Sequence, residues 1–278
     1  MDWSRAKNIL ILIFVLLNVF LSATIISELK GNKVTKEIIS NAKLALKERG
    51  VEVNCNISDY NGSVGNLTYK KMSFDRMRLV QNIFGEETVI DELLEQGYIE
   101  RNGRELRFLD EYSFVFKNFE PEEALSGLNN PDKVLGYVEK LLKGTELPVL
   151  DFKIDFVEHE NEGTETYVFR QKYRDFWVVE NHITVNLSED YLEIVCRYQK
   201  VDSIKNSKKV MPVYQVLLKN HEIIKDIAIN KIELGFKNSE RDDGRRETDG
   251  IPVWCVEIES NGNKVKKYFN AYDGDEIE

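Results

Sequence analysis

The side chains best suited to metal or acid–base chemistry stand apart from one another in the sequence. His159, His182 and His221 have no Glu-x-x-His partner and no cysteine at ligand spacing, so no zinc site is predicted. Each histidine is more simply a surface residue or a residue on a strand face. The sequence also contains no Gly-x-Ser-x-Gly elbow, no Gly-x-Gly-x-x-Gly turn and no phosphate-binding loop. We therefore expect no catalytic residue, no metal, no cofactor and no enzymatic activity.

Carboxylates are abundant, but their spacing does not identify a site. Asp242-Asp243-Gly244 and Asp273-Gly274-Asp275 begin like calcium loops, yet neither continues into a twelve-residue loop that ends in Glu. Each is more simply a turn. A catalytic pair of carboxylates is defined by its geometry, and sequence spacing alone does not supply that geometry.

The cysteine count is low and odd. Cys55, Cys196 and Cys255 permit at most one disulfide, so the chain is not a disulfide scaffold. Cys196 and Cys255 lie in strand-like patterns, where a small buried side chain is the default interpretation. A disulfide between these two residues stays open at this level.

The charge balance is acidic. The chain has 38 Lys and Arg against 48 Asp and Glu, a net charge of −10, which argues against nucleic acid or an anionic lipid surface as the main partner. Hydrophobic residues make up 42% and charged residues 31%, which excludes a disordered chain. Once an anchor is subtracted, about 250 residues remain for one large or two smaller cores.

One segment near the N-terminus is long and apolar enough to be a membrane anchor. Ile9 to Ile26 carries no charged residue, and a helix of that length rises about 27 Å, close to the roughly 30 Å hydrocarbon core. Arg5 and Lys7 precede the segment, so the positive-inside rule predicts that the N-terminus is cytoplasmic and the remainder extracellular. Trp3 lies where an aromatic anchor would meet the inner interface.

The alternative is a cleavable signal peptide. Small residues occur at Ser22 and Ala23, but Leu21 or Phe20 would then occupy the −3 position, where a small residue is needed. An uncleaved anchor is the favoured interpretation, which makes this a single-pass protein.

Asn18 is a polar residue near the middle of the apolar segment. A buried amide in a bilayer usually bonds to another transmembrane helix, and at helical spacing Asn18 shares one stripe with five neighbours. The alternative is that Asn18 bonds to its own helix or reaches water. The candidate transmembrane partner interface consists of Ile11, Phe14, Val15, Asn18, Ser22 and Ile25.

The elements beyond the anchor follow a repeated order in which a helix precedes antiparallel strands. The predicted helices are Val34–Leu46, Pro131–Leu142 and Val210–Leu218. The predicted strands are Val51–Ile57, a hairpin within Leu106–Phe116 that turns near Asp110-Glu111, Val149–His159, Glu165–Tyr173, Trp177–Asn186, Tyr191–Val201, Ile227–Phe236, and a closing hairpin of Ile251–Glu259 and Val265–Tyr272 around Asn261-Gly262.

Turn residues and polar runs separate these elements. Asn61, Gly62, Gly65 and Asn66 predict turns, and the run Asn238–Gly250, which has no apolar residue, predicts an exposed loop. The pattern predicts an α+β fold of antiparallel sheets that each carry one helix. The expected parts are a cytoplasmic head (1–8), a transmembrane anchor (9–29), a membrane-proximal α+β part (30–130) and a C-terminal α+β domain (131–278).

Several fragments resemble the YycI family when their order and spacing are taken together. Met1-Asp2-Trp3-Ser4 followed by a basic pair and one apolar span resembles the family's start, and Phe169-Arg170-Gln171-Lys172-Tyr173 resembles part of its double strand. Val210 to Leu217 resembles its helix, and Ile232-Glu233-Leu234-Gly235-Phe236 resembles a later strand. The structural positions that carry the resemblance are Trp3, Gln171, Tyr173, Tyr214, Leu234, Gly235, Pro252, Trp254, Asn270, Ala271 and Gly274.

The resemblance covers residues 1–57 and 147–278, whereas residues 58–146 are not placed by it. Two departures are Pro212, which interrupts the third helix where the family tends to have Ser or Ala, and Asp275, where Glu is commoner. The closing hairpin also resembles the PepSY module, a small extracytoplasmic binding domain.

The resemblance implies a function without catalysis. YycI proteins are accessory proteins of the essential cell-wall two-component system of low-GC Gram-positive bacteria, the WalK/WalR or YycG/YycF system. The resemblance therefore implies a membrane protein that binds the sensor histidine kinase and restrains it together with a YycH-like protein. The competing interpretation is a membrane-anchored PepSY-like binding or protease-restraining module with a different client. An anchored hydrolase ranks third because no nucleophile–base or metal motif supports it.

Overall fold

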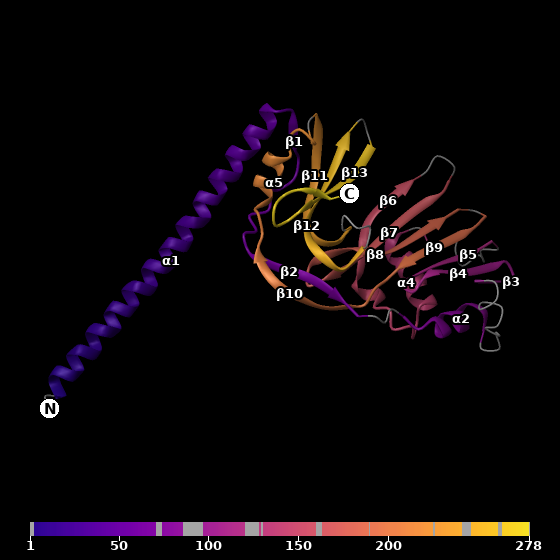
Figure 1. The fold of residues 1–278 in the computed structure, drawn as a ribbon, viewed down its shortest axis with the longest axis horizontal. Helices are drawn as coiled ribbons and strands as arrows, with labels where there is room; N and C mark the ends of the chain where they lie inside the picture. Colours follow the sequence, from indigo (N-terminus) through magenta and orange to yellow (C-terminus); the bar gives the residue numbers. More distant parts are fainter. Residues whose placement is uncertain are drawn as a thin grey trace.

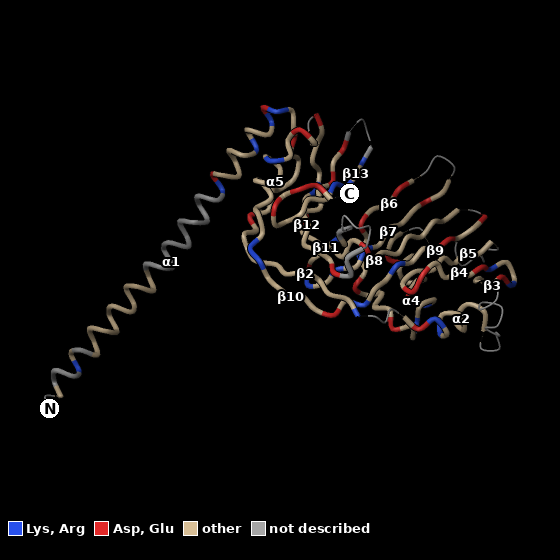
Figure 2. Tube along the Cα trace, viewed as in Figure 1, with Lys and Arg blue, Asp and Glu red and all other residues tan. Residues whose placement is uncertain are grey.

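The computed structural model describes residues 3–70, 74–85, 97–119, 128, 130–159, 163–188, 190–224, 226–240, 246–260 and 263–277. For 4–6, 9, 23–35, 239–240, 246–248, 260 and 263 it describes the course of the backbone. A long N-terminal helix projects from a sheet-rich body (Figure 1). Charged residues are spread over that body, whereas Asn8 to Ser22 of the projecting helix carries none (Figure 2).

The projecting helix is α1, which runs without a break over Trp3–Glu48. The predicted apolar span and the predicted amphipathic helix are therefore parts of one helix. Its last turns bury Ala42 and Leu46 against the body, and Gly50, with φ +80°, stands just beyond its end. Within the described part of the chain, no helix has the length and hydropathy of a membrane-spanning segment.

The body is built on strands that hydrogen-bond into one continuous network. In the described part of the chain, fourteen strands form a sheet whose main path is β10-β2-β12-β11-β8-β9-β5-β4-β3, with the other strands branching from it. The strands are β1 (Val51–Val53), β2 (Ser63–Tyr69), β3 (Tyr98–Arg101), β4 (Arg104–Asp110), β5 (Ser113–Asn118), β6 (Phe152–His159), β7 (Glu165–Tyr173), β8 (Phe176–Leu187), β9 (Leu192–Arg197), β10 (Val201–Lys209), β11 (Ile227–Glu240), β12 (Arg246–Ser260), β13 (Asn263–Asn270) and β14 (Glu276–Ile277).

The sheet carries two separate hydrophobic cores, which divide the body into two halves. The α4 half comprises α2 (Arg76–Phe84), α4 (Pro131–Leu141) and strands β3–β9, and its core includes Leu79, Val138 and Phe169. The α5 half comprises the end of α1, α5 (Val213–Lys219) and the remaining strands. The predicted boundary between the membrane-proximal part and the C-terminal domain is at residue 130, and each core contains residues from both sides of it. The predicted domain division itself stays a prediction.

The α+β class with few helices is confirmed, but the expectation of separate antiparallel sheets was wrong. A short parallel contact between β8 and β11, with Gly235 opposite Trp177 and Phe236 opposite Val178, joins the two halves into one network. A Cβ on Gly235 would lie only 2.7 Å from the Trp177 carbonyl oxygen. The close approach of the two strands therefore depends on the absence of a side chain at Gly235.

Local signals placed several regular elements of the α4 half well. The hairpin of β4 and β5 turns after Asp110 as predicted, and β7 and β8 lie within a residue of their predicted bounds. The helix predicted from Pro131 is α4, whose N-cap Asn130 accepts a hydrogen bond from the Lys133 backbone N–H at 3.0 Å.

Five elements were missed or misread. The turn prediction around Gly65 and Asn66 was wrong because both lie inside β2, which pairs with β10. Strand β10 itself was missed, since its side chains are mostly exposed and give no apolar alternation. Helix α2 and strand β3 fall in the stretch that the sequence did not place. The third helix begins at Val213, after Pro212, because proline suits the residues that enter a helix better than its interior.

The loop predicted over the polar run Asn238–Gly250 is longer than the structure allows. Strand β11 continues to Glu240 and β12 starts at Arg246, with Asn238 opposite Gly250, so much of 238–250 is paired strand. Residues 241–245, which include the predicted Asp242-Asp243-Gly244 turn, lie outside the described residues. The pairing of Ser260 with Asn263 confirms the closing hairpin.

Candidate functional site

The projecting part of α1 presents the predicted partner interface to its surroundings. Ile11, Phe14 and Val15 are 50%, 66% and 51% exposed, and Asn18 and Ser22 are also exposed. The side chain of Ile25 lies outside the described residues, as do the side chains from Ala23 to Thr35. Trp3, the predicted interfacial anchor, is 85% exposed.

Asn18 bonds within its own helix. Its side-chain Nδ2 donates to the Phe14 backbone carbonyl oxygen at 2.8 Å, which is the alternative left open by the sequence. The amide has a second hydrogen and a carbonyl oxygen that such a bond does not use. The bond to Phe14 therefore satisfies one amide hydrogen while leaving polar capacity on the stripe.

The family-motif positions of the closing hairpin hold α5 against the sheet. The Trp254 Nε1–H donates to the Met211 carbonyl oxygen at 2.9 Å, and the Met211 N–H donates to the Ala271 carbonyl oxygen at 2.7 Å. The Ala271 N–H in turn donates to the Pro252 carbonyl oxygen at 2.9 Å. All but Met211 are buried, so this chain of hydrogen bonds is structural.

The Asp273-Gly274-Asp275 segment is a turn, as predicted. The Asn270 Oδ1 accepts from the Tyr272 N–H at 2.9 Å, and Gly274 has φ +81°. The Lys219 ammonium bonds to the Asp275 carboxylate, and to the Asp273 carbonyl oxygen at 2.9 Å. A lysine from α5 therefore supplies the positive charge at this acidic turn.

Gln171 lies in a buried amide network. Its Oε1 accepts a hydrogen bond from the Asn181 Nδ2 at 2.7 Å. The Asn181 Nδ2 also donates to the Gln199 carbonyl oxygen at 2.8 Å, and the Asn181 Oδ1 accepts from the Gln199 backbone N–H at 2.9 Å. Gln171 and Asn181 are 3% and 0% exposed. The network fixes the chain where it leaves β9 for β10. The remaining motif positions, Tyr173, Tyr214 and Leu234, pack on the core of the α5 half.

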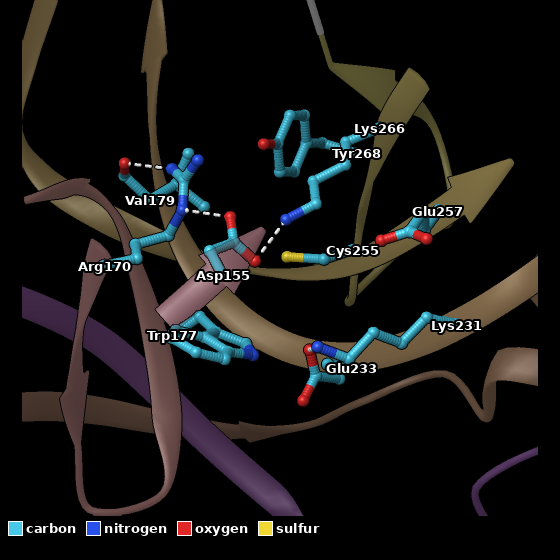
Figure 3. A pocket seen from close by; sticks show the side chains of 10 residues that line it. All are labelled: Asp155, Arg170, Trp177, Val179, Lys231, Glu233, Cys255, Glu257, Lys266 and Tyr268. Atoms are coloured by element: carbon cyan, nitrogen blue, oxygen red, sulfur yellow. Dashed lines mark hydrogen bonds and ion pairs between the residues drawn. The ribbon is translucent and has the colours of Figure 1, made fainter. Parts of the chain in front are cut away.

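A charged cleft lies between the two halves (Figure 3). One wall comes from β6, β7 and β8 of the α4 half and the other from β11, β12 and β13 of the α5 half. Its lining mixes three cations and three carboxylates, so these side chains carry no net charge. The lining residues are Asp155, Arg170, Trp177, Val179, Lys231, Glu233, Cys255, Glu257, Lys266 and Tyr268.

Asp155 is the centre of the cleft. Asp155 has no paired residue on β7, because Ile154 pairs with Phe169 and Phe156 pairs with the next residue, Val168. Such an irregularity changes the direction of a side chain. The Arg170 Nε donates to its Oδ2 at 3.0 Å, and the Lys266 ammonium bonds to its Oδ1. Lys266 belongs to β13, so the bond to Asp155 crosses between the halves.

Arg170 lies between two irregular strands. The β7–β8 register jumps from the Arg170–His182 pair to the Gln171–Val178 pair, and an Arg170 guanidinium N–H donates to the Val179 carbonyl oxygen inside this jump. On its other side, the Arg170 guanidinium donates to the Asp155 carboxylate. Arg170 is thus held within the α4 half from both of its neighbouring strands.

Burial and charge act in opposite directions on Asp155. Desolvation acts to raise its pKa, but the Lys266 hydrogen bond and the Arg170 charge outweigh that effect and hold the pKa below its ordinary value. Asp155 is therefore an anion at neutral pH.

The cysteines are free thiols. Cys196 is buried in the core of the α4 half, whereas Cys255 lines the cleft, so the disulfide left open by the sequence does not form here. Burial raises the pKa of Cys255 to about 12, which keeps its thiol protonated at neutral pH. Burial likewise raises the pKa of Tyr268 to about 12.

The three histidines remain apart in space. His159 lies 3.2 Å from Glu165, and His221 lies 3.1 Å from Glu222. His182 is near the cleft, and burial together with the Arg170 charge lowers its pKa. In the part of the chain that the structure describes, no three metal-ligating side chains converge.

Sequence reasoning missed the Asp155–Arg170–Lys266 cluster. Lys266 is 111 residues from Asp155, and nothing in the local pattern pairs them. The local sequence gives no signal, because Asp155 lies between Ile154 and Phe156 in regular alternation and would be predicted to face water.

The comparisons with known proteins bear on the whole body. Residues 29–272 match the family model of the YycI protein. The chain belongs to the YycI family. The resemblance of its motifs to that family is thereby confirmed, and the match extends over residues 58–146, which the motifs did not place.

Two solved structures align with the chain at TM-scores below 0.5. An uncharacterized protein from Eubacterium rectale ATCC 33656 aligns with a TM-score of 0.44 and 11% identity, covering 86% of this YycI-family chain and 98% of that one. The Bacillus megaterium YpeB C-terminal domain aligns with a TM-score of 0.41 and 8% identity, covering 74% and 97%. No curated protein matches the sequence. Membership of the YycI family suggests a regulatory accessory protein of the YycG/WalK two-component system.

Proposed function

We propose that this protein is a single-pass membrane protein that binds a WalK/YycG-like sensor histidine kinase and restrains it, together with a YycH-like partner. The observation that carries the proposal is the match of residues 29–272 to the YycI family. The protein acts by binding, without catalysis and without a cofactor.

The surface of α1 supports a membrane anchor. The large apolar side chains between Leu10 and Leu21 are each at least 50% exposed. A soluble protein rarely leaves such a continuous apolar surface uncovered. A bilayer is the occupant that suits a helix with apolar residues on all sides. The exposed residues are Leu10, Ile11, Leu12, Ile13, Phe14, Val15, Leu16, Leu17, Val19, Phe20 and Leu21. With the basic residues before this segment, the body is extracellular.

The contact with the kinase has two components in this proposal. The stripe around Asn18 packs beside the kinase's transmembrane helices, and the body meets partners outside the membrane. Either contact changes kinase output only by a difference in affinity for its signalling states. A contact that binds both states equally leaves the output unchanged.

The stripe is tested by co-purification from native membranes. Asn18→Leu removes the polar group, and interhelical polar contacts in membranes are worth about 0.6–1.7 kcal/mol, so recovery of the kinase should fall about 3- to 20-fold. Leu16→Ala is the matched control because Leu16 lies on the opposite face of α1.

Two outcomes would contradict parts of the proposal. Unchanged recovery and unchanged kinase autophosphorylation in Asn18→Leu would remove the stripe from the mechanism. Crosslinking of the full-length protein that yields a peptidase or another envelope enzyme, and no kinase, would overturn the kinase as client.

A further inference from the structure

Polar side chains line the cleft between the two halves of the body, whereas the β8–β11 contact beside it is apolar. Along β11, Ile232 and Leu234 pack on the core of the α5 half, whereas Lys231 and Glu233, on the other face, line the cleft. The same alternation recurs on β12, where Trp254 is in the core and its neighbour Cys255 lines the cleft. An interface of this composition resembles one between domains that move relative to each other.

Two groups of contacts join the halves beside the cleft. The first is at the parallel β8–β11 contact, where Gly235 pairs with Trp177 and the rings of Phe176 and Phe236 lie 5.6 Å apart. Val178 of β8 is buried in the core of the α5 half, so this contact fixes the line about which the halves can turn.

The second group is centred on Lys266 of β13. Its ammonium bonds to Asp155 and lies 5.6 Å from the centre of the Phe156 ring, both on β6. Figure 3 shows the Lys266 ammonium directed at Asp155, with Lys231 and Glu233 of β11 farther along the lining of the cleft. Strand β6 hydrogen-bonds only to β7 among the described strands, so Lys266 meets it through side chains.

We propose that the two halves open and close about the β8–β11 contact, and that the bond between Asp155 and Lys266 is the latch of the closed arrangement. Opening separates β6 from β13 and exposes the cleft. The end of α1 packs in the α5 half, so opening changes the position of the α4 half relative to α1.

The latch can break without leaving a buried charge unpaired. When Lys266 leaves, the Asp155 carboxylate keeps its hydrogen bond from Arg170, which belongs to the same half. The Lys266 side chain is 21% exposed in the closed arrangement and therefore reaches water readily. Breaking a buried ion pair is costly when one charge stays buried without a partner. Here neither Asp155 nor Lys266 is left in that state.

The native cysteines report opening directly. Cys255 lines the cleft beside the latch, whereas Cys196 is fully buried in the α4 core and reacts only when that core unfolds. The experiment measures the labelling rate of each thiol by mass spectrometry in the full-length protein in detergent. Lys266→Met keeps an unbranched side chain of similar size and removes the charge, so Cys255 labelling should accelerate at least fivefold while Cys196 stays unlabelled.

Two variants bracket the result. Lys264→Met is the matched control, because Lys264 is exposed on the same face of β13 two residues away, and it should leave both rates unchanged. Lys266→Arg keeps the positive charge and should restore slow labelling. Equal Cys255 rates in Lys266→Met and the native protein would overturn the latch.

A salt series on the native protein gives a readout that needs no variant. Salt screens the closed pair only weakly because the Asp155 side chain is 2% exposed, but it stabilises the Lys266 charge once opening brings that charge into water, so the Cys255 rate should rise with ionic strength while Cys196 stays protected. If Lys266→Met unfolds, Cys196 reacts as well, and the salt series then decides. A Cys255 rate that is independent of salt would contradict the proposal.

Discussion

Gly235→Ala tests the closest approach between the two halves. The added methyl group would lie 2.7 Å from the Trp177 carbonyl oxygen, 3.1 Å from the Trp177 Cβ and 3.3 Å from the Cys255 Sγ. The first distance is to backbone, so the strands themselves must move, and overpacking of this kind costs about 1–3 kcal/mol. Replacing glycine also restricts the unfolded chain, which returns about 0.4–1 kcal/mol.

The expected net effect is a destabilisation of about 1–2 kcal/mol. For a body of this size, that corresponds to a fall in Tm of about 2–8 °C in calorimetry. Gly136→Ala is the control, because nothing lies within 4 Å of a Cβ at this position of α4. In a helix interior, that change should stabilise the protein by about 0.5–1 kcal/mol. If Gly235→Ala were as stable as the native protein, the argument that this glycine permits the β8–β11 contact would be refuted.

Three further changes probe other parts of the site. Gln171→Met should cost about 1–3 kcal/mol in urea unfolding because it leaves the buried Asn181 amide short of an acceptor, and a loss below 0.5 kcal/mol would contradict this role. Trp254→Phe keeps an aromatic ring and removes the bond to the Met211 carbonyl, so a loss of about 1 kcal/mol is expected by the same assay, and no loss would exclude that bond from the anchoring of α5. The folded-state pKa of Asp155 is lowered, so its contribution is present above the unfolded value of about 3.9 and is lost as pH falls through the folded value. Asp155→Asn should therefore lower the free energy of unfolding at pH 7, and that free energy should fall less below about pH 4 than it does in the native protein. Urea titrations in which both proteins lose the same free energy of unfolding below pH 4 would contradict this.

Local patterns were sufficient for elements whose signals lie within one segment. Helix α4 has a polar N-cap, a proline in its first turn and apolar residues at helical spacing, so its bounds could be predicted to within one residue. The β4–β5 and β12–β13 hairpins join neighbouring strands, and their turn residues were visible. These elements required no knowledge of distant contacts.

Long-range pairing could not be predicted in the same way. Strand β2 pairs with β10, from which it is separated by more than a hundred residues, and its Gly65 and Asn66 give a turn signal that this pairing overrides. The charged cleft likewise depends on strand irregularities at Asp155 and near Val179, which have no signature in a single sequence. The family-motif positions were recognisable, and most of them hold elements together.

Strand β11 gives the molecule a direct mechanical path. Its first residues pair in parallel with β1, which follows α1 after a short turn, and farther along the same strand Gly235 and Phe236 meet β8. A pull or a tilt applied to α1 therefore loads the β1–β11 ladder in shear and is carried by one continuous strand to the point where the two halves join. Displacement of the helix within its surroundings is thus transmitted through β11 to the point where the two halves join, with only the turn at Arg49-Gly50 between the helix and the ladder.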